Sequence, residues 1–291
     1  MRTVVCLIAD PRQQTLAEPL LAAVGRDLAG ETRWLAAGEA AEIVTNLDAG
    51  EAAARARAAV GDRPVDVAAL PAEGRRKRLM LSDMDSTMIT IECIDELAAC
   101  AGIKDEVAAI TRRTMNGELD FGQSVRARVA LLEGLPASVI ADICRDTLRF
   151  MPGAAMAVRT MRRHGVRCVL VSGGFTQFTG YVREHLGFEV DEANELEIVN
   201  GRLTGRLAGP LRDADSKLQA LGRQCAELGI GPAQALTVGD GANDVPMLQA
   251  AGLGVAFRAH PRVQAAVPVN IRHADLTALL YLQGYPRAEW A

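Results

Sequence analysis

The amino-acid sequence predicts an α/β protein with a doubly wound, mostly parallel, Rossmann-like sheet, a helical cap insertion and an N-terminal ferredoxin-like α+β domain. Three observations lead to this expectation. Residues 1–74 show the element order βαββαβ, residues from about 92 to 150 show only helical periodicity, and later residues alternate between apolar strands and helices. We therefore expect two domains, at residues 1–74 and 75–291.

Short apolar strands and two helices make up the predicted N-terminal unit. The expected strands are Thr3–Ala9, Thr32–Ala36, Ala41–Thr45 and Val65–Leu70, and the expected helices are Gln13–Leu28 and Glu51–Val60. This order is that of a ferredoxin-like split unit. A linker at residues 71–74 and the basic run at residues 75–78 lead into the second domain.

The second domain begins with an apolar strand that ends at Asp83, and the cap insertion follows at about residues 92–150. The helices expected after it are Ala154–His164, Phe175–Leu186, Asp213–Leu228 and Asn243–Ala250. The strands expected between them are Val166–Val171, Phe188–Glu192, Ala235–Val238 and Leu253–Ala256. Such alternation predicts a mostly parallel sheet with right-handed crossovers. The dipeptide Asn200-Gly201 predicts a β-hairpin over about 195–207.

Composition argues against several classes of protein. The net charge of -4 gives no basic field, so we do not expect nucleic-acid binding. The apolar stretch at residues 4–9 is too short for a signal sequence or a membrane span, so we expect a cytoplasmic protein without a membrane partner. Six scattered cysteines form no Cys-x-x-Cys pair and are expected to be free thiols.

Asp83 and Asp85 follow the first strand of the second domain, at the carboxyl end where open α/β sheets bind ligands. Two carboxylates this close require a cation or a shared proton. One aspartate is suited to attack phosphorus, and the other to act as acid and base on the leaving and entering oxygens. Taken alone, the pattern is explained equally well by aspartates that cap the next helix.

Three further motifs also lie at strand ends or helix starts. Ser172 and Gly173 stand where a strand passes into a helix, which suits a phosphate oxygen, although such residues also serve merely to bend a chain. Asp240 and Asp244 follow another strand in a glycine-rich turn and could hold Mg²⁺ with Asp83, or only cap a helix. Lys217 near a helix start could pair with the nucleophile, although a single lysine usually lies at the surface.

These four motifs occur in the order found in the haloacid dehalogenase superfamily, which residues 78–291 resemble. The resemblance implies that Asp83 is the nucleophile, that Asp85 is the acid and base, and that Lys217 stabilises the transferring phosphoryl group. It further implies roles for residues of the phosphate and metal sites. Phosphate is bound by Ser172 and Gly173, Mg²⁺ by Asp83, the Asp85 backbone carbonyl and Asp240, and support comes from Asn243 and Asp244.

The cap sequence carries a narrower resemblance. Glu92-Cys-Ile-Asp-Glu-Leu-Ala and Phe121-Gly-Gln-Ser-Val-Arg-Ala-Arg are similar to segments of phosphoserine phosphatases, which catalyse the last step of serine biosynthesis. The resemblance implies that Glu92 binds the substrate ammonium, that Arg128 binds its carboxylate, and that Met115 and Phe121 line the pocket. A guanidinium fork suits a carboxylate. Without the resemblance, Glu92 and Arg128 would be interpreted as a surface ion pair.

Two alternatives remain open from the sequence. The first is a related phosphatase, or a phosphotransferase that passes phosphate to an acceptor such as homoserine. The second is a non-catalytic amino-acid sensor that acts through the N-terminal unit, which intact Asp83, Asp85, Lys217 and Asp240 argue against. The βαββαβ unit is similar to amino-acid-binding ACT domains, and either ligand binding or homodimer formation is compatible with it.

Overall fold

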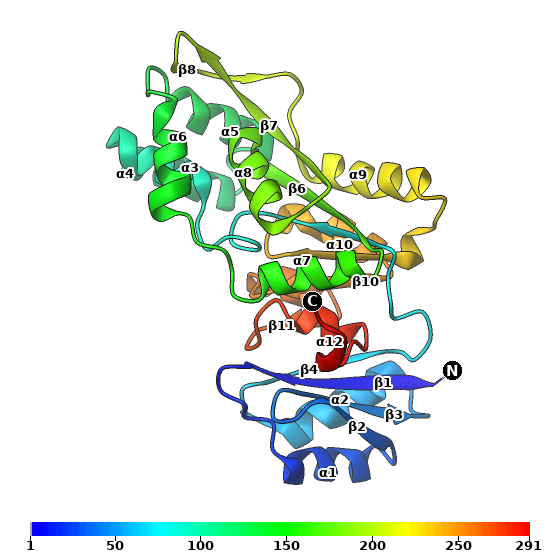
Figure 1. The fold of residues 1–291 in the computed structure, drawn as a ribbon. Coiled ribbons are helices and arrows are strands. Elements are labelled where there is room, and N and C mark those ends of the chain that lie inside the picture. The colour runs from blue at the N-terminus through cyan, green and yellow to red at the C-terminus, as the bar shows by residue number, and fades with distance from the viewer. Residues whose placement is uncertain (1) are drawn as a thin grey trace.

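The computed structural model describes residues 2–291, except for the side chain of Met115. Figure 1 shows the N-terminal unit at the bottom of the view, the core above it, and the cap helices at the upper left beside the β7–β8 hairpin. The predicted fold class is confirmed, because a four-stranded antiparallel sheet precedes a seven-stranded and mostly parallel one.

The N-terminal unit has the predicted βαββαβ order. Its elements are β1 (Thr3–Ala9), α1 (Glu18–Asp27), β2 (Glu31–Ala36), β3 (Ala40–Thr45), α2 (Ala49–Val60) and β4 (Val65–Pro71), with the sheet order β2-β3-β1-β4. The helix expected from Gln13 begins only at Glu18, so that part of the prediction was wrong. Gln14 adopts a left-handed φ of 48°, which stops a helix there, and the proline in the first turn of α1 suits a helix start.

Strand β1 is buried on both faces. Val5 and Leu7 belong to the cluster that includes residues of α1 and α2, whereas Val4 and Ile8 belong to the main core cluster. Because successive side chains of a strand point to opposite faces, the N-terminal sheet has its own helices on one face and the core domain on the other. The long apolar run of β1 is the sequence signature of this double burial.

Two buried polar groups join the N-terminal unit to the C-terminal part of the chain. The Asp66 carboxylate accepts hydrogen bonds from the backbone N–H groups of Arg272, His273 and Ala274, at 2.8 to 3.3 Å. The Arg75 guanidinium donates to Glu42 at 2.7 Å and to the Tyr281 carbonyl at 3.1 Å. Buried charges are tolerated only with such complete pairing, so this junction has a fixed geometry.

The core sheet has the order β11-β10-β9-β5-β6-β7-β8. Its strands are β5 (Leu79–Ser82), β6 (Arg167–Phe175), β7 (Val190–Val199), β8 (Arg202–Ala208), β9 (Ala235–Gly239), β10 (Leu253–Phe257) and β11 (Val269–Ile271). All neighbours pair in parallel except β7 and β8. The parallel strands therefore all point in the same direction. As a result, the carboxyl ends of β5, β6 and β9 lie together at one end of the sheet.

Helices cover both faces of the core sheet. They are α7 (Ala154–Arg163), α8 (Thr176–Leu186), α9 (Ala214–Glu227), α10 (Val245–Ala250), α11 (Pro261–Ala266) and α12 (Ala278–Leu282), with the short 3₁₀ turns η2 (Pro232–Gln234), η3 (Ala242–Asp244) and η4 (Arg287–Glu289). Leu79 and Leu81 pack in one cluster with Leu221 of α9, whereas Met80 packs in another with Ala157 of α7. None of the helices in residues 2–291 is long and apolar enough to cross a membrane.

The cap is helical, as predicted. It consists of α3 (Cys93–Ala101), α4 (Lys104–Met115), α5 (Phe121–Ala130), α6 (Ser138–Asp142) and the π-helix η1 (Ile143–Thr147). The two chain segments that connect it to the core lie side by side. The N–H of Met151 donates to the Met88 carbonyl at 2.9 Å, and the N–H of Thr90 donates to the Arg149 carbonyl at 3.0 Å.

The predicted hairpin is present, but β7 differs from the prediction. The two strands expected at Phe188–Glu192 and Glu195–Val199 form one continuous strand, which pairs with β6 in its first half and with β8 in its second. Asn200 and Gly201 both have positive φ, at 51° and 74°, as the predicted Asn-Gly turn requires. The hairpin reaches the cap, where the N–H of Leu203 donates to the Leu135 carbonyl at 2.9 Å.

Candidate active site

The predicted catalytic motifs meet at the carboxyl edge of three neighbouring strands. Asp83 follows β5, Ser172 lies near the end of β6, and Asp240 follows β9. Because β9, β5 and β6 are adjacent and parallel, their ends lie side by side although they are far apart in sequence. Lys217 reaches the same edge from the first turns of α9, whose N-cap is Asp213.

Lys217 lies between two carboxylates. Its Nζ is 2.7 Å from Asp83 Oδ1 and 2.5 Å from Asp244 Oδ1, and the lysine side chain is only 1% exposed. Burial alone would lower the pKa of Lys217, but the attraction of Asp244 and Asp83 outweighs it and raises that pKa. The ammonium group is therefore retained, and it fixes the orientation of Asp83.

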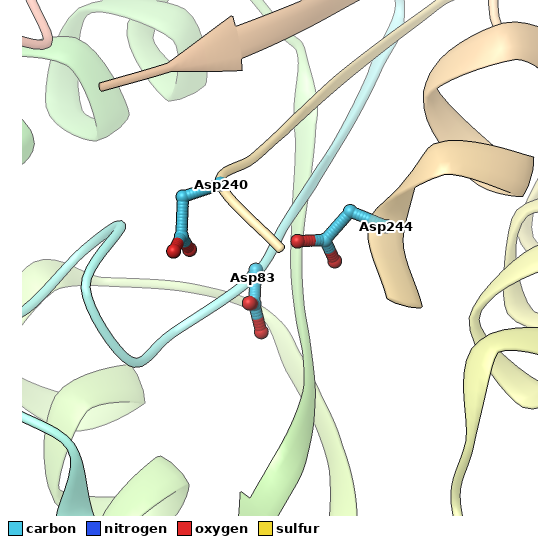
Figure 2. A group of neighbouring side chains, drawn as sticks. All are labelled: Asp83, Asp240 and Asp244. Atoms are coloured by element: carbon cyan, nitrogen blue, oxygen red, sulfur yellow. The ribbon is translucent and has the colours of Figure 1, made fainter. Parts of the chain in front are cut away.

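Asp83, Asp240 and Asp244 form a carboxylate cluster in which one oxygen of each lies within 4.8 Å of the others. Figure 2 shows them approaching one another from the end of β5 and from the turn and helix after β9. Burial and the neighbouring Asp244 raise the pKa of Asp83 well above its usual range, and the same two causes raise the pKa of Asp240 to about 7. One lysine cannot neutralise three carboxylates, so the cluster has excess negative charge.

The donor set fits a hard divalent cation. Such ions prefer oxygen ligands, and Mg²⁺ typically keeps several waters and takes only one or two carboxylates. Asp240 Oδ1 accepts the hydroxyl proton of Thr87 at 2.9 Å, but among the described residues neither Asp240 Oδ2 nor Asp83 Oδ2 receives a hydrogen bond. The predicted ligands Asp83 and Asp240 thus share a cluster. The third side chain of the cluster is Asp244, which was expected nearby, whereas the side chain of Asp85 contacts Cys93.

Asp85 is held by Cys93, the first residue of the cap helix α3. The Cys93 thiol donates to Asp85 Oδ1 at 3.0 Å, and the Cys93 backbone N–H lies 3.4 Å from Asp85 Oδ2. Burial and the nearby Glu92 raise the pKa of Asp85 to about 7. A carboxyl group that titrates near neutrality can both give and take a proton. Apart from its position next to Glu92, nothing in the sequence around Cys93 indicates this contact.

The last residues of β6 lie beside these carboxylates, where the pairing of β6 with β7 is irregular between Val171 and Phe175. Ser172 is buried, and its hydroxyl oxygen accepts the N–H of Gly174 at 2.8 Å. A β-carbon on Gly174 would lie 3.2 Å from Asp85 Oδ2, and one on Gly173 would lie 3.1 Å from the ring of Phe121. Both glycines therefore allow a close approach that a larger residue would crowd.

The cap contributes Glu92 and Arg128 to the same pocket without joining them to each other. The Ser86 hydroxyl donates to Glu92 Oε1 at 2.6 Å, and Arg128 Nε donates weakly to the Ser124 carbonyl at 3.3 Å. No ion pair links Glu92 with Arg128 in the part of the chain that the structure describes. Burial raises the pKa of Glu92 and lowers that of Arg128. The surface ion pair considered from the sequence is thus not what the structure contains.

The predicted site residues converge on one pocket of about 240 Å³. It is lined by Asp83, Asp85, Glu92, Ile94, Phe121, Val125, Arg128, Ser172, Gly173, Gly174, Phe175, Asp240, Gly241 and Asn243. Lys217 lies behind Asp83 rather than on the pocket wall. Met115 ends α4, and its side chain lies outside the described part of the structure. Sequence reasoning missed the apolar wall residues Ile94 and Val125, which helical periodicity marks only as core positions.

Comparison with known proteins gives a consistent result. Residues 80–249 match the haloacid dehalogenase-like hydrolase family. A phosphoserine phosphatase of Streptomyces coelicolor is 48% identical over 227 residues, which are 77% of this chain and 55% of the relative. The chain thus spans about half the length of that relative.

Two solved structures are also similar. A probable phosphoserine phosphatase from Vibrio cholerae, in an unliganded form, has a TM-score of 0.80 and 30% identity, and the match covers 99% of this chain and 88% of that one. A phospho-aspartyl intermediate analogue of phosphoserine phosphatase has a TM-score of 0.66 and 36% identity, over 71% of this chain and 98% of that one. The first match includes the N-terminal unit as well as the core.

Proposed function

We propose that this chain, which belongs to the haloacid dehalogenase-like hydrolase family, hydrolyses O-phosphoserine to serine and phosphate through an aspartyl-phosphate on Asp83. One observation carries the proposal. A lysine-bound aspartate opens onto the same pocket as a glutamate and an arginine that are not paired with each other. Phosphoserine has a phosphate that suits the aspartate, an ammonium group that suits the glutamate and a carboxylate that suits the arginine. Similarity to the Streptomyces phosphatase supports this assignment.

The first chemical step is a transfer to Asp83. Lys217 occupies Asp83 Oδ1, so we assign Oδ2 as the attacking oxygen. As the bond from Oδ2 to phosphorus forms, the bond from phosphorus to the serine oxygen breaks, and protonated Asp85 gives its proton to that oxygen. A pKa near 7 supplies Asp85 in the protonated form at neutral pH.

The second step regenerates the enzyme. Asp85, now ionised, takes a proton from a water molecule whose oxygen attacks phosphorus, and the bond between phosphorus and Asp83 breaks. Ser172 and the Gly173 N–H are positioned to bind phosphoryl oxygens, and Asn243 lines the same side of the pocket. Phe121 lies over Gly173 and helps to exclude bulk water from the pocket, apart from the water molecule that reacts.

The cofactor in this proposal is Mg²⁺. Asp83 and Asp240 would hold it, with the Asp85 backbone carbonyl as a further oxygen ligand and Asp244 nearby. When bound, the ion neutralises negative charge on the transferring phosphoryl group. Lys217 orients Asp83 through its contact with Oδ1.

Substrate recognition is assigned to the cap. Glu92 binds the ammonium group, Arg128 binds the carboxylate with its planar fork, and Phe121 completes the wall. For the N-terminal unit, residues 1–74, we propose an ACT-like domain that forms a homodimer contact or binds a regulatory amino acid. Its βαββαβ topology supports this part of the proposal.

A substrate screen tests the proposed activity. Small phosphorylated metabolites are incubated with the full chain, with Mg²⁺ or with a chelator, and phosphate and the dephosphorylated product are both quantified. We expect phosphoserine to be preferred, with equal amounts of serine and phosphate and no turnover in chelator. Addition of homoserine should leave the phosphate yield unchanged, whereas phosphohomoserine formation would identify a phosphotransferase. A preference for a bulky sugar phosphate would contradict the proposal.

A further inference from the structure

A second concave region lies where the N-terminal unit meets the core. It is a groove of about 490 Å³, twice the size of the active-site pocket, and shares no lining residue with it. Residues of α2 and β4 form one wall, and residues of α11 and β11, with the turn after β11, form the other. Nothing in the proposed phosphatase reaction uses this groove.

Basic side chains from both units line this interdomain groove. Arg57 and Arg63 come from the N-terminal unit, and Arg272 and His273 follow β11 of the core. All four are exposed. Within residues 2–291, no carboxylate lies within ion-pairing distance of the three guanidinium groups, and the one side-chain hydrogen bond among them runs from Arg63 to the Val60 carbonyl. Three uncompensated positive charges thus gather in one hollow of a protein whose net charge is -4.

The single acidic residue in the groove can offset only one of these three charges. Asp66 is only 4% exposed, and both of its carboxylate oxygens accept backbone N–H groups of residues 272–274. Its carboxylate thereby holds the turn after β11 in place and leaves the three guanidinium groups without an ion-pair partner among the described residues. That turn carries Arg272 and His273, so the same contact fixes the basic residues of the core beside those of α2 and β4.

We propose that the interdomain groove binds a small, multiply charged anion with phosphate or carboxylate groups. Guanidinium forks match both groups with paired hydrogen bonds, and one bound anion would relieve the repulsion among the arginines. The concave shape and the limited number of charges favour a small molecule over a nucleic acid. Because its ligands come from both units, a bound anion also strengthens the contact between them.

Calorimetric titration of the full chain tests this proposal. Pyrophosphate and tricarballylate are titrated separately, in chelator, so that no divalent cation bridges them to the active site. We expect at least one probe to bind and to raise the unfolding temperature. Arg57→Ala combined with Arg272→Ala should weaken its affinity by about tenfold or more, because two charge-assisted contacts are lost. Binding of only one probe identifies the group that is recognised.

Matched variants separate the groove from the rest of the surface. Arg145→Ala and Arg206→Ala remove exposed arginines of the cap and the hairpin and should leave the affinity unchanged. Ser172→Ala alters the active-site pocket and should also leave the affinity for the anion unchanged. Arg272→Lys retains the charge but not the fork, and we expect an intermediate affinity. The proposal is overturned if neither probe binds, or if the double variant binds as tightly as the unaltered chain.

Discussion

The two halves of the active-site pocket are built on different principles. At the strand ends, Asp83, Lys217 and Asp244 hold one another through short and buried contacts. On the cap side, the side chains of Glu92 and Arg128 each form one hydrogen bond within the described residues and none to each other. The first half is organised before any ligand arrives, whereas the second keeps two opposite charges apart. This difference is what the proposed function requires, with phosphoryl transfer carried out by the core and substrate choice made by the cap.

The largest expected effect comes from the core half. Asp83→Asn keeps the size of the side chain but removes the nucleophilic carboxylate. We expect kcat for phosphoserine to fall by roughly a thousandfold or more, since the covalent route is lost. Steady-state assays with Mg²⁺ measure this, and intact-mass analysis of quenched enzyme should no longer detect a phosphoryl adduct. Turnover at an undiminished rate would refute the nucleophile assignment.

Removal of the central ammonium should cost stability as well as activity. Lys217→Met leaves Asp83 and Asp244 buried together without their shared partner. We expect the free energy of unfolding in urea to fall by about 3–5 kcal/mol at neutral pH. The deficit should shrink in acid, where protonation removes the repulsion. Lys104→Met, at an exposed position on the cap, serves as the control and should unfold like the unaltered chain.

The cap half should respond in KM rather than in kcat. Arg128→Ala removes a group assigned to the substrate carboxylate, which is distant from the bond that breaks. We expect KM for phosphoserine to rise by about 10–100-fold with a much smaller change in kcat. Arg128→Lys should recover only part of the loss because lysine lacks the fork. An equal fall in kcat for both variants would place Arg128 in the chemical step instead.

The metal requirement should depend on pH. Burial and Asp244 raise the pKa of Asp240 to about 7, and a divalent cation binds the ionised carboxylate. As pH falls below 7, more of the carboxylate is protonated, so the Mg²⁺ concentration for half-maximal activity should rise, by up to about tenfold per pH unit for each proton displaced. Activity titrations between pH 5.5 and 8.5 measure this slope. A requirement that stays constant across this range would contradict the cause given for the raised pKa.

The smallest effect is expected where the two halves touch. Cys93→Ala removes the thiol donor to Asp85 but keeps the backbone N–H. We expect kcat to fall by a few fold, about 1 kcal/mol, which is the usual value of one hydrogen bond. Cys93→Ser should restore most of the rate, because a hydroxyl also donates. If the serine variant is no better than the alanine variant, the contact has no part in orienting Asp85.

The sequence predicts the residues at the strand ends better than it predicts their contacts with the cap and with neighbouring helices. Asp83, Ser172 and Asp240 could be located because each follows an apolar strand, and parallel strands end at one edge of a sheet. The hydrogen-bond partner of Asp85 could not be predicted, because Cys93 lies in a helix whose position depends on the packing of the whole cap. Asp244 was expected as a possible partner of Asp83 and Asp240, and the three carboxylates do form one cluster. Its contact with Lys217 was not expected, because that contact depends on how η3 meets α9.

Long-range contacts explain the errors in the fold as well. The strands predicted separately before and after Asn194 form one strand, since that side chain bonds to the Gly173 carbonyl and the Arg212 N–H instead of starting a turn. The short elements α11, β11 and α12 were not predicted. Strand β11 and helix α12 contact β4 and β1 of the N-terminal unit, and Asp66 bonds to Arg272 just after β11. These partners lie about 200 residues apart and leave no local periodicity.

The paired connections of the cap have a consequence for how this architecture diversifies. Because Met88 and Met151 are hydrogen bonded, the inserted segment leaves and rejoins the core at a single point, so its length contributes little strain to the sheet. We therefore expect that the segment between these two connections can be exchanged for another cap as one cassette, provided that the replacement keeps the donor that Cys93 supplies to Asp85. Grafting the cap of a relative between these two connections should therefore change the proposed substrate preference without altering the residues at the strand ends.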